Sequence, residues 1–241
     1  MRITVDDPQT WPAEVQAACE ELAARAMDSP EYVSDLNLSS ENEDSFRTLL
    51  RGHLVVAFHA TRLLPHEVQG IRTGGLRRLT AELIMDRVEQ ASNHGLITDE
   101  ERAALRGAHV FATGEARNRE GRVCFFLSES TLRNRLHGVR PLMREWGGEA
   151  ISMSSGGAGF RPRLRQLGAP AIVVATLNLD QGQRVHSVWP GVQDVFVGRW
   201  LGLDDVDADV HFRDDVPAQH IEAVWLPGDA EYDRFPGLPR E

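Results

Sequence analysis

The chain has 241 residues, 41% of them hydrophobic and 26% charged, which suits one large domain with a sizeable core better than two small ones. No run of about 18 apolar residues occurs and the first residues lack the apolar core of a signal peptide, so we expect a cytoplasmic protein with no membrane span. The net charge is −10 and all 26 basic residues are arginines, which excludes any mechanism that needs a lysine base, a Schiff base or a phosphate-loop lysine.

Apolar spacing, capping residues and glycine or proline breaks predict the secondary structure along the chain. In chain order we expect helices at 11–28 and 40–51, a buried strand at 54–58, helices at 65–73, 80–94 and 98–107, a strand at 122–128, a short helix at 141–146, a flexible glycine-rich loop at 154–159, a short helix at 161–167, strands at 171–179, 195–201, 208–213 and 220–226, and an irregular last dozen residues.

This order places most helices before most strands, without regular alternation of the two. It favours an α+β fold over a doubly wound parallel sheet. We expect residues 1–50 to form an acidic helical segment packed on a core made by residues 51–241, with one structural domain overall.

The first candidate site follows the strand at 54–58. There the sequence reads Phe58-His59-Ala60-Thr61-Arg62, then a helix, then Gly74-Gly75-Leu76. A buried strand that ends in histidine and threonine presents donors and acceptors at the sheet edge, and the helix and glycine turn would close a pocket over that edge. The stretch resembles the first conserved block of the ADP-ribosyltransferase superfamily, in the His-x-Thr branch that includes poly(ADP-ribose) polymerases, RNA 2′-phosphotransferases and DNA- or RNA-targeting bacterial toxins.

The resemblance implies a split, mostly antiparallel sheet and NAD as substrate, with no metal. His59 would bind a ribose hydroxyl, and Ala60 would offer backbone contacts to nicotinamide. Thr61 and Arg62 would line the dinucleotide, with Arg62 available to the pyrophosphate as a bidentate partner. The alternative is a satisfied strand-end histidine followed by an ordinary amphipathic helix.

The strand at 122–128 is similar to the family's second block, which carries an aromatic residue that stacks on nicotinamide. Phe125 or Phe126 would replace the usual tyrosine, because stacking needs only an aromatic face. Alternation lets only one of the two face a pocket, and we favour Phe126 because Ser128 would then share its face. The alternative is that both phenylalanines belong to the core.

Members of the family use a glutamate to bond the nicotinamide ribose and to stabilise its oxocarbenium-like charge. Glu149 follows two glycines that permit close approach of a ligand, and it is the preferred candidate. Asp209 matches the family's late catalytic strand by its order along the chain, although aspartate is a departure there. Glu149 could instead cap a helix or pair with an arginine, and Asp209 could be a plain exposed strand acid.

Charge is unevenly distributed along the chain. Residues 1–50 hold 11 acids and 3 arginines, residues 180–241 hold 13 and 5, and residues 51–179 hold 12 and 18, so the middle has a net charge of +6. We expect an anionic ligand to bind this middle part, where arginine-rich stretches at 117–122 and 161–165 could hold phosphates. A solvated mixed surface is the alternative. Cysteine and histidine show no metal-ligand spacing, and both cysteines are expected to be buried and reduced.

Taken together, the residues and the resemblance predict an NAD-dependent ADP-ribosyltransferase that modifies a macromolecular target, either nucleic acid or protein. Intracellular enzymes of this type are often toxins or phage-defence effectors, which would imply an antitoxin or regulator as partner. Two alternatives remain. One is a catalytically inactive module of the same fold that binds nucleotide, nucleic acid or a protein. The other is RNA 2′-phosphotransfer.

Overall fold

The fold is seen in a computed structural model, which describes residues 1–26, 30–36, 38, 41–116, 119–133, 139–179, 185–187, 191–204, 206 and 209–241. These residues form one seven-stranded sheet with the order β5-β6-β3-β2-β4-β7, and β1 pairs with β2 off this path. The strands are β1 (Arg2–Ile3), β2 (Leu54–Leu63), β3 (Val123–Phe126), β4 (Ala169–Leu177), β5 (Val185–Ser187), β6 (Asp209–Phe212) and β7 (Ile221–Trp225). Only the short β1–β2 pair is parallel, so the α+β class expected from the sequence is confirmed.

The central strand β2 pairs with its two neighbours over very different lengths. It pairs with β4 continuously, from Val55 opposite Leu177 to Leu63 opposite Ala169. On its other edge it pairs with β3 only where Phe58 lies opposite Phe126. Beyond that point the two strands part, so the half formed by β5, β6 and β3 meets the half formed by β2, β4 and β7 at a single register position.

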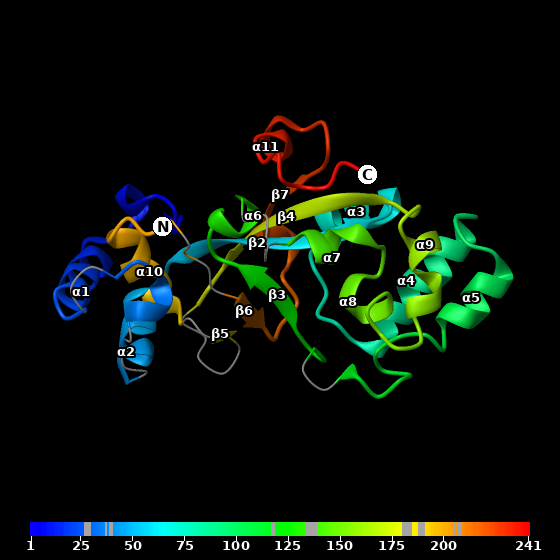
Figure 1. Cartoon of the computed structure of the whole chain (residues 1–241), viewed down its shortest axis with the longest axis horizontal. Coiled ribbons are helices and arrows are strands. Elements are labelled where there is room, and N and C mark those ends of the chain that lie inside the picture. Colours follow the sequence, from blue (N-terminus) through cyan, green and yellow to red (C-terminus); the bar gives the residue numbers. More distant parts are fainter. Residues whose placement is uncertain are drawn as a thin grey trace.

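Helices gather at both ends of this sheet (Figure 1). At one end, α1 (Ala13–Ala23) and α2 (Glu41–Leu49) pack with α10 (Val192–Trp200). The other end holds α4 (Ala81–Asn93), α5 (Asp99–Leu105), α8 (Gly148–Ile151) and α9 (Arg161–Leu164). The remaining helices are α3 (Pro65–Gly74), α6 (Ser130–Arg133), α7 (Arg140–Arg144) and α11 (Ala230–Asp233). None of the helices in the described part of the chain has the length and apolar character needed to cross a lipid bilayer.

The largest hydrophobic core joins the N-terminal helices to one face of the sheet. At its centre, the ring of Phe196 on α10 lies 4.8 Å from that of Trp11 and 5.4 Å from that of Phe46, measured between ring centroids. The opposite face of the sheet is covered by a second cluster that includes Phe58, Ile172 and Tyr232. The described residues of the N-terminal segment are therefore tied to the C-terminal half of the chain by apolar packing.

Most predicted elements are confirmed, but the strand expected at 195–201 is wrong, because residues 195–200 belong to α10 and Leu201 caps its C-terminus. The run Val195-Phe196-Val197 lacks a period that could distinguish a strand from a buried helix. All side chains from Val192 to Gly198 are buried, as in a helix that is enclosed on every side. Its N-terminus is capped by the Glu43 carboxylate, which accepts hydrogen bonds from the backbone N–H groups of Val192 and Gln193, each at 3.1 Å.

Three further expectations need correction. The strand predicted to end at Phe58 continues to Leu63, because the backbone after Phe58 keeps pairing with β4. The segment 154–159 is packed: the buried Ser154 hydroxyl accepts a hydrogen bond from the backbone N–H of Gly157 at 2.9 Å, and residues 158–160 form a 3-10 helix. The last dozen residues include α11, whose Tyr232 is fully buried.

Candidate functional site

A cavity of about 350 Å³ lies where β2 and β3 part. It is lined by the second half of β2, by β3, by both α3 and α4, and by the start of α8 with the turn before it. The glycine turn after α3 is sterically required: Gly75 has a φ of +88°, and a Cβ there would lie 2.0 Å from the Val216 carbonyl oxygen. This close approach lets Leu76 pair with Val216 and fixes the rim of the cavity.

His59 connects the two halves of the sheet beside this cavity. Its Nδ1 lies 2.8 Å from the Cys124 carbonyl oxygen, which can only accept, so Nδ1 carries the proton. Burial lowers the pKa of His59, an effect that the Cys124 carbonyl opposes and the charge of Arg87 reinforces. The ring is therefore neutral near pH 7, and its Nε2 is left as a hydrogen-bond acceptor.

The cavity brings together several residues that the sequence analysis selected from separate segments. His59, Ala60 and Thr61 line it from β2, Phe126 from β3 and Glu149 from α8. Phe126 is partly exposed, whereas Phe125 is fully buried and packs against the His59 ring at 5.8 Å between centroids. Phe126 lies opposite Phe58 and so is on the other face of the sheet from the His59 ring, but both residues line the cavity, which lies where β2 and β3 part.

Arg62 does not line the cavity, contrary to the expectation from the sequence. It is 4% exposed, and its guanidinium donates to the carbonyl oxygens of Leu167 and Arg165, each at 2.7 Å, and of Gly168 at 3.1 Å. Because it lies three residues after His59 in a continuous strand, it points to the opposite face of the sheet. Its donors serve the backbone around the start of β4 and leave no fork for a pyrophosphate.

Ser128 also lies outside the cavity. Its side chain is fully buried, and its hydroxyl donates to the Asp6 carboxylate at 2.7 Å. Asp6 in turn accepts from Arg199 at 2.8 Å, so the contact joins the end of β3 to the N-terminus and to α10. The shared face expected for Ser128 and Phe126 requires a continuous strand, but β3 ends at Phe126.

Glu149 lies in the first turn of α8, with its side chain 37% exposed. Its Oε1 lies 3.1 Å from an Nη of Arg119, so the carboxylate has a cationic partner. The two preceding glycines adopt positive φ values, +83° at Gly147 and +46° at Gly148, and a Cβ at Gly147 would lie 2.7 Å from the Ile151 side chain. These glycines bring α8 to the cavity wall.

Sequence reasoning missed a buried ion pair in the same wall. The Glu67 side chain is 9% exposed, and its carboxylate accepts hydrogen bonds from Arg87 Nε at 2.5 Å, Trp146 Nε1 at 3.0 Å and the Leu64 backbone N–H at 2.7 Å. Burial alone would raise the pKa of Glu67, but the charge of Arg87 and these hydrogen bonds hold it below its ordinary value. The position of Glu67 just after Pro65 marked a helix start, but nothing local indicated Arg87 or Trp146.

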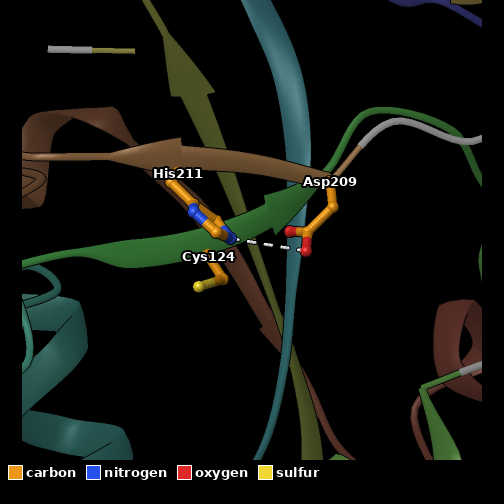
Figure 2. A group of neighbouring side chains, drawn as sticks. All are labelled: Cys124, Asp209 and His211. Carbon is orange, nitrogen blue, oxygen red and sulfur yellow. Dashed lines mark ion pairs between the residues drawn. The ribbon is translucent and has the colours of Figure 1, made fainter. Parts of the chain in front are cut away.

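A third group of polar side chains lies beside the cavity, where Cys124 on β3 neighbours Asp209 and His211 on β6 (Figure 2). One potential ligand atom from each lies within 4.8 Å of the others. However, an Nη of Arg122 lies 3.0 Å from His211 Nδ1. Arginine can only donate, so Nδ1 accepts and Nε2 carries the proton, 3.4 Å from the Asp209 carboxylate.

This hydrogen-bonding pattern decides what the group can do. A metal-bound histidine normally donates its second N–H to a carboxylate or carbonyl, whereas His211 accepts from a cation. The arrangement therefore disfavours a divalent metal. Burial, with the nearby charges of Asp209 and Glu149, raises the pKa of Cys124 to about 12, so it stays a thiol and is a poor nucleophile. The group is connected to the cavity by Arg122, which contacts His211 and lines the cavity.

Comparison with known proteins finds no matching family model, no matching curated protein and no matching solved structure.

Proposed function

We propose that the chain is an NAD-dependent ADP-ribosyltransferase that modifies a macromolecular target. The observation that carries this proposal is the neutral His59, whose Nδ1 is anchored on the Cys124 carbonyl at the parting of β2 and β3. The remaining Nε2 is an acceptor, which suits a ribose hydroxyl and does not suit an anion. This chemistry of His59 supports the role that the resemblance implies for it.

Two features of the surroundings support the same function. The sheet halves meet at one register position, which agrees with the split sheet of the superfamily. The cavity volume of about 350 Å³ lies within the range of small-molecule sites, and its lining combines the aromatic ring of Phe126 with carboxylate and guanidinium groups. An aromatic face next to polar groups suits nicotinamide, which is planar and carries an amide.

In the proposed reaction the nicotinamide stacks on Phe126 and its ribose donates to His59 Nε2. The bond between the ribose carbon and the nicotinamide nitrogen breaks, and its electron pair leaves with nicotinamide. A carboxylate stabilises the positive charge that develops on the ribose. A nucleophilic oxygen or nitrogen of the target then bonds to the same carbon and releases its proton.

Two carboxylates are candidates for the stabilising acid. Glu149 lines the cavity and is the one that we favour. Asp209 lies on β6 directly opposite Phe126, so the two side chains share a face of the sheet, although Asp209 does not contribute to the cavity lining. Removing each carboxylate separately distinguishes the two.

The decisive measurement is nicotinamide release from NAD by the purified protein, with and without cell lysate. We expect His59→Ala to abolish release without unfolding the protein, while His53→Ala, at a histidine outside the cavity lining, leaves it unchanged. Loss of release in Glu149→Ala would assign the acid to Glu149, and loss only in Asp209→Asn would assign it to Asp209. Release that persists in folded His59→Ala would contradict the proposal.

One observation favours a second candidate, a non-catalytic module that binds nucleotide, nucleic acid or a protein. Glu149 is partly solvent-exposed and already paired with Arg119, so its field at a developing cation is compensated and screened. Calorimetry with NAD, ADP-ribose and nucleic acid separates the two functions. Binding of any of these without nicotinamide release would support the module.

A further inference from the structure

Within the part of the chain that the structure describes, every arginine that lines the cavity except one forms an ion pair with a carboxylate. Four arginines contribute to the lining. Three of them have a carboxylate partner at 2.5 to 3.1 Å: Arg77 with Asp86, Arg87 with Glu67, and Arg119 with Glu149. Among the described residues, Arg122 makes no such ion pair, and its hydrogen-bond partner is the unprotonated Nδ1 of His211. Of the described arginines in the lining, Arg122 is therefore the one whose guanidinium is available to a ligand without displacing a carboxylate.

The side chains behind Arg122 hold it in place without neutralising it directly. His211 lies opposite Cys124 in the β3–β6 register, with its side chain 13% exposed. Its Nδ1 accepts from Arg122 at 3.0 Å, and its Nε2–H faces the Asp209 carboxylate at 3.4 Å. The imidazole thus separates the two charges and orients the guanidinium, much as an outer partner orients a metal ligand. A guanidinium has five N–H donors, and this bond uses one of them.

We propose that Arg122 forms a subsite for a phosphate group at the β3 wall of the cavity, with His211 as its positioning residue. A guanidinium fork matches two phosphate oxygens, and the bond is strengthened because both partners are charged. The other cavity arginines are less available, since a ligand phosphate would have to displace a carboxylate from each. The phosphate belongs either to the diphosphate of NAD or to a nucleic-acid target, so this inference deepens the proposed function and rests on it for the identity of the ligand only.

The subsite is tested by titrating the full-length protein with inorganic pyrophosphate, ADP and adenosine in a calorimeter. We expect Arg122→Met to weaken the binding of pyrophosphate and of ADP at least about tenfold, which is the loss of affinity that corresponds to one charge-assisted hydrogen bond. Adenosine, which has no phosphate, serves as the reference ligand. Arg77→Met is the matched control, because Arg77 also lines the cavity but is paired with Asp86, and its affinities should stay within about twofold of the wild type.

Two further titrations identify the source of the phosphate. If Arg122→Met weakens the binding of NAD to the same extent as the binding of ADP, the subsite holds the diphosphate of the dinucleotide. If NAD is unaffected but a single-stranded oligonucleotide binds less tightly, the subsite holds a phosphate of the target. Failure of the wild type to bind pyrophosphate, or equal losses in Arg122→Met and Arg77→Met, would overturn the subsite.

The positioning role of His211 has its own readout. In two-bond ¹H–¹⁵N spectra we expect His211 to be the Nε2–H tautomer in the wild type and a mixture of tautomers in Arg122→Met. His211→Gln can accept from Arg122 and donate to Asp209, so it should keep pyrophosphate affinity within about threefold, whereas His211→Leu should lose most of it. An Nδ1–H tautomer in the wild type, or undiminished binding by folded His211→Leu, would refute the role.

These outcomes are independent of catalysis. A protein that releases no nicotinamide but binds pyrophosphate through Arg122 would disprove the transferase and keep the subsite. A protein that releases nicotinamide equally well with and without Arg122, and whose pyrophosphate binding does not change, would keep the transferase and remove the subsite.

Discussion

Glu67→Gln removes one negative charge from the cavity wall and keeps the shape of the side chain. The carboxylate that it replaces bonds Arg87 on α4, Trp146 after α7 and the Leu64 backbone N–H at the start of α3. It therefore caps α3 and joins this helix to α4 and to the segment after α7. The variant asks how much of the stability of this end of the molecule comes from a single buried charge.

The size of the effect follows from what the glutamine leaves behind. Breaking a buried ion pair from one side costs roughly 3–5 kcal/mol, because the other charge stays buried without a partner. Arg87 retains 20% side-chain exposure and lies over the Trp146 ring, 5.2 Å from its centroid, so water and the ring compensate part of that loss. We expect the free energy of unfolding to fall by about 2–4 kcal/mol.

The assay is urea unfolding of both proteins from pH 7 to about pH 4. The pKa of Glu67 is lowered in the folded state, so its stabilisation is present above the unfolded value near 4.5 and is lost as the pH falls through the folded value. The gap between wild type and variant should narrow in acid. The control is Asp86→Asn, which breaks an ion pair with both side chains about half exposed and should cost no more than about 1 kcal/mol. The reasoning would be refuted if both variants lost the same free energy of unfolding, or if the difference between the wild type and Glu67→Gln did not change with pH.

Three other substitutions test the packing in different ways. Arg62→Met should lower the free energy of unfolding by about 2–4 kcal/mol, because several buried carbonyls lose their donor. Unchanged stability together with weaker NAD binding would show instead that Arg62 contacts the ligand. Burial raises the pKa of Asp194 to about 6, so the folded protein favours the protonated carboxyl and its stability falls as the pH rises through 6. In denaturant titrations at pH 7.5, Asp194→Asn should therefore raise the free energy of unfolding by about 1–2 kcal/mol. A lower free energy of unfolding in the variant would contradict this. A Cβ at Gly157 would lie 1.7 Å from the Ile151 carbonyl oxygen, so Gly157→Ala should lower the melting temperature by several degrees. Gly159→Ala is the control, because a Cβ there has open space around it and should leave the melting temperature unchanged. Similar melting temperatures of the two variants would show that the turn at Gly157 can relax.

Local signals predicted helix starts well, because the residues that cap a helix lie next to it in the chain. Thr98 and Glu101 form the expected capping box at α5, and the Thr80 hydroxyl accepts from the backbone N–H of Leu83 at α4. The prediction of a strand at 195–201 was wrong because the residue that caps the helix formed there lies far away in the chain. The apolar run fits either state, and the choice was made by Glu43, which caps α10 from about 150 positions away along the chain.

The candidate site shows the same division. His59 was selected because it follows a buried strand in a stretch that resembles the family's first block, and Phe126 because alternation lets only one of two adjacent phenylalanines face a pocket. Arg62 was misplaced because β2 continues beyond the expected end, which turns alternate residues to opposite faces. Glu67, Arg87 and His211 had no sequence signal, since their partners come from other elements.

By itself the sequence determined the α+β class, the absence of lysine chemistry and the buried strand that begins at Leu54, because composition and local periodicity act through neighbouring residues. Only the tertiary structure decided the tautomers of His59 and His211, the ion pairs of three cavity arginines and the contact of Arg122 with His211. Each of these depends on a distance between segments that the folded sheet sets. Hydrogen bonds and charge compensation act over a few ångströms, and the order of residues along the chain does not specify which groups come that close.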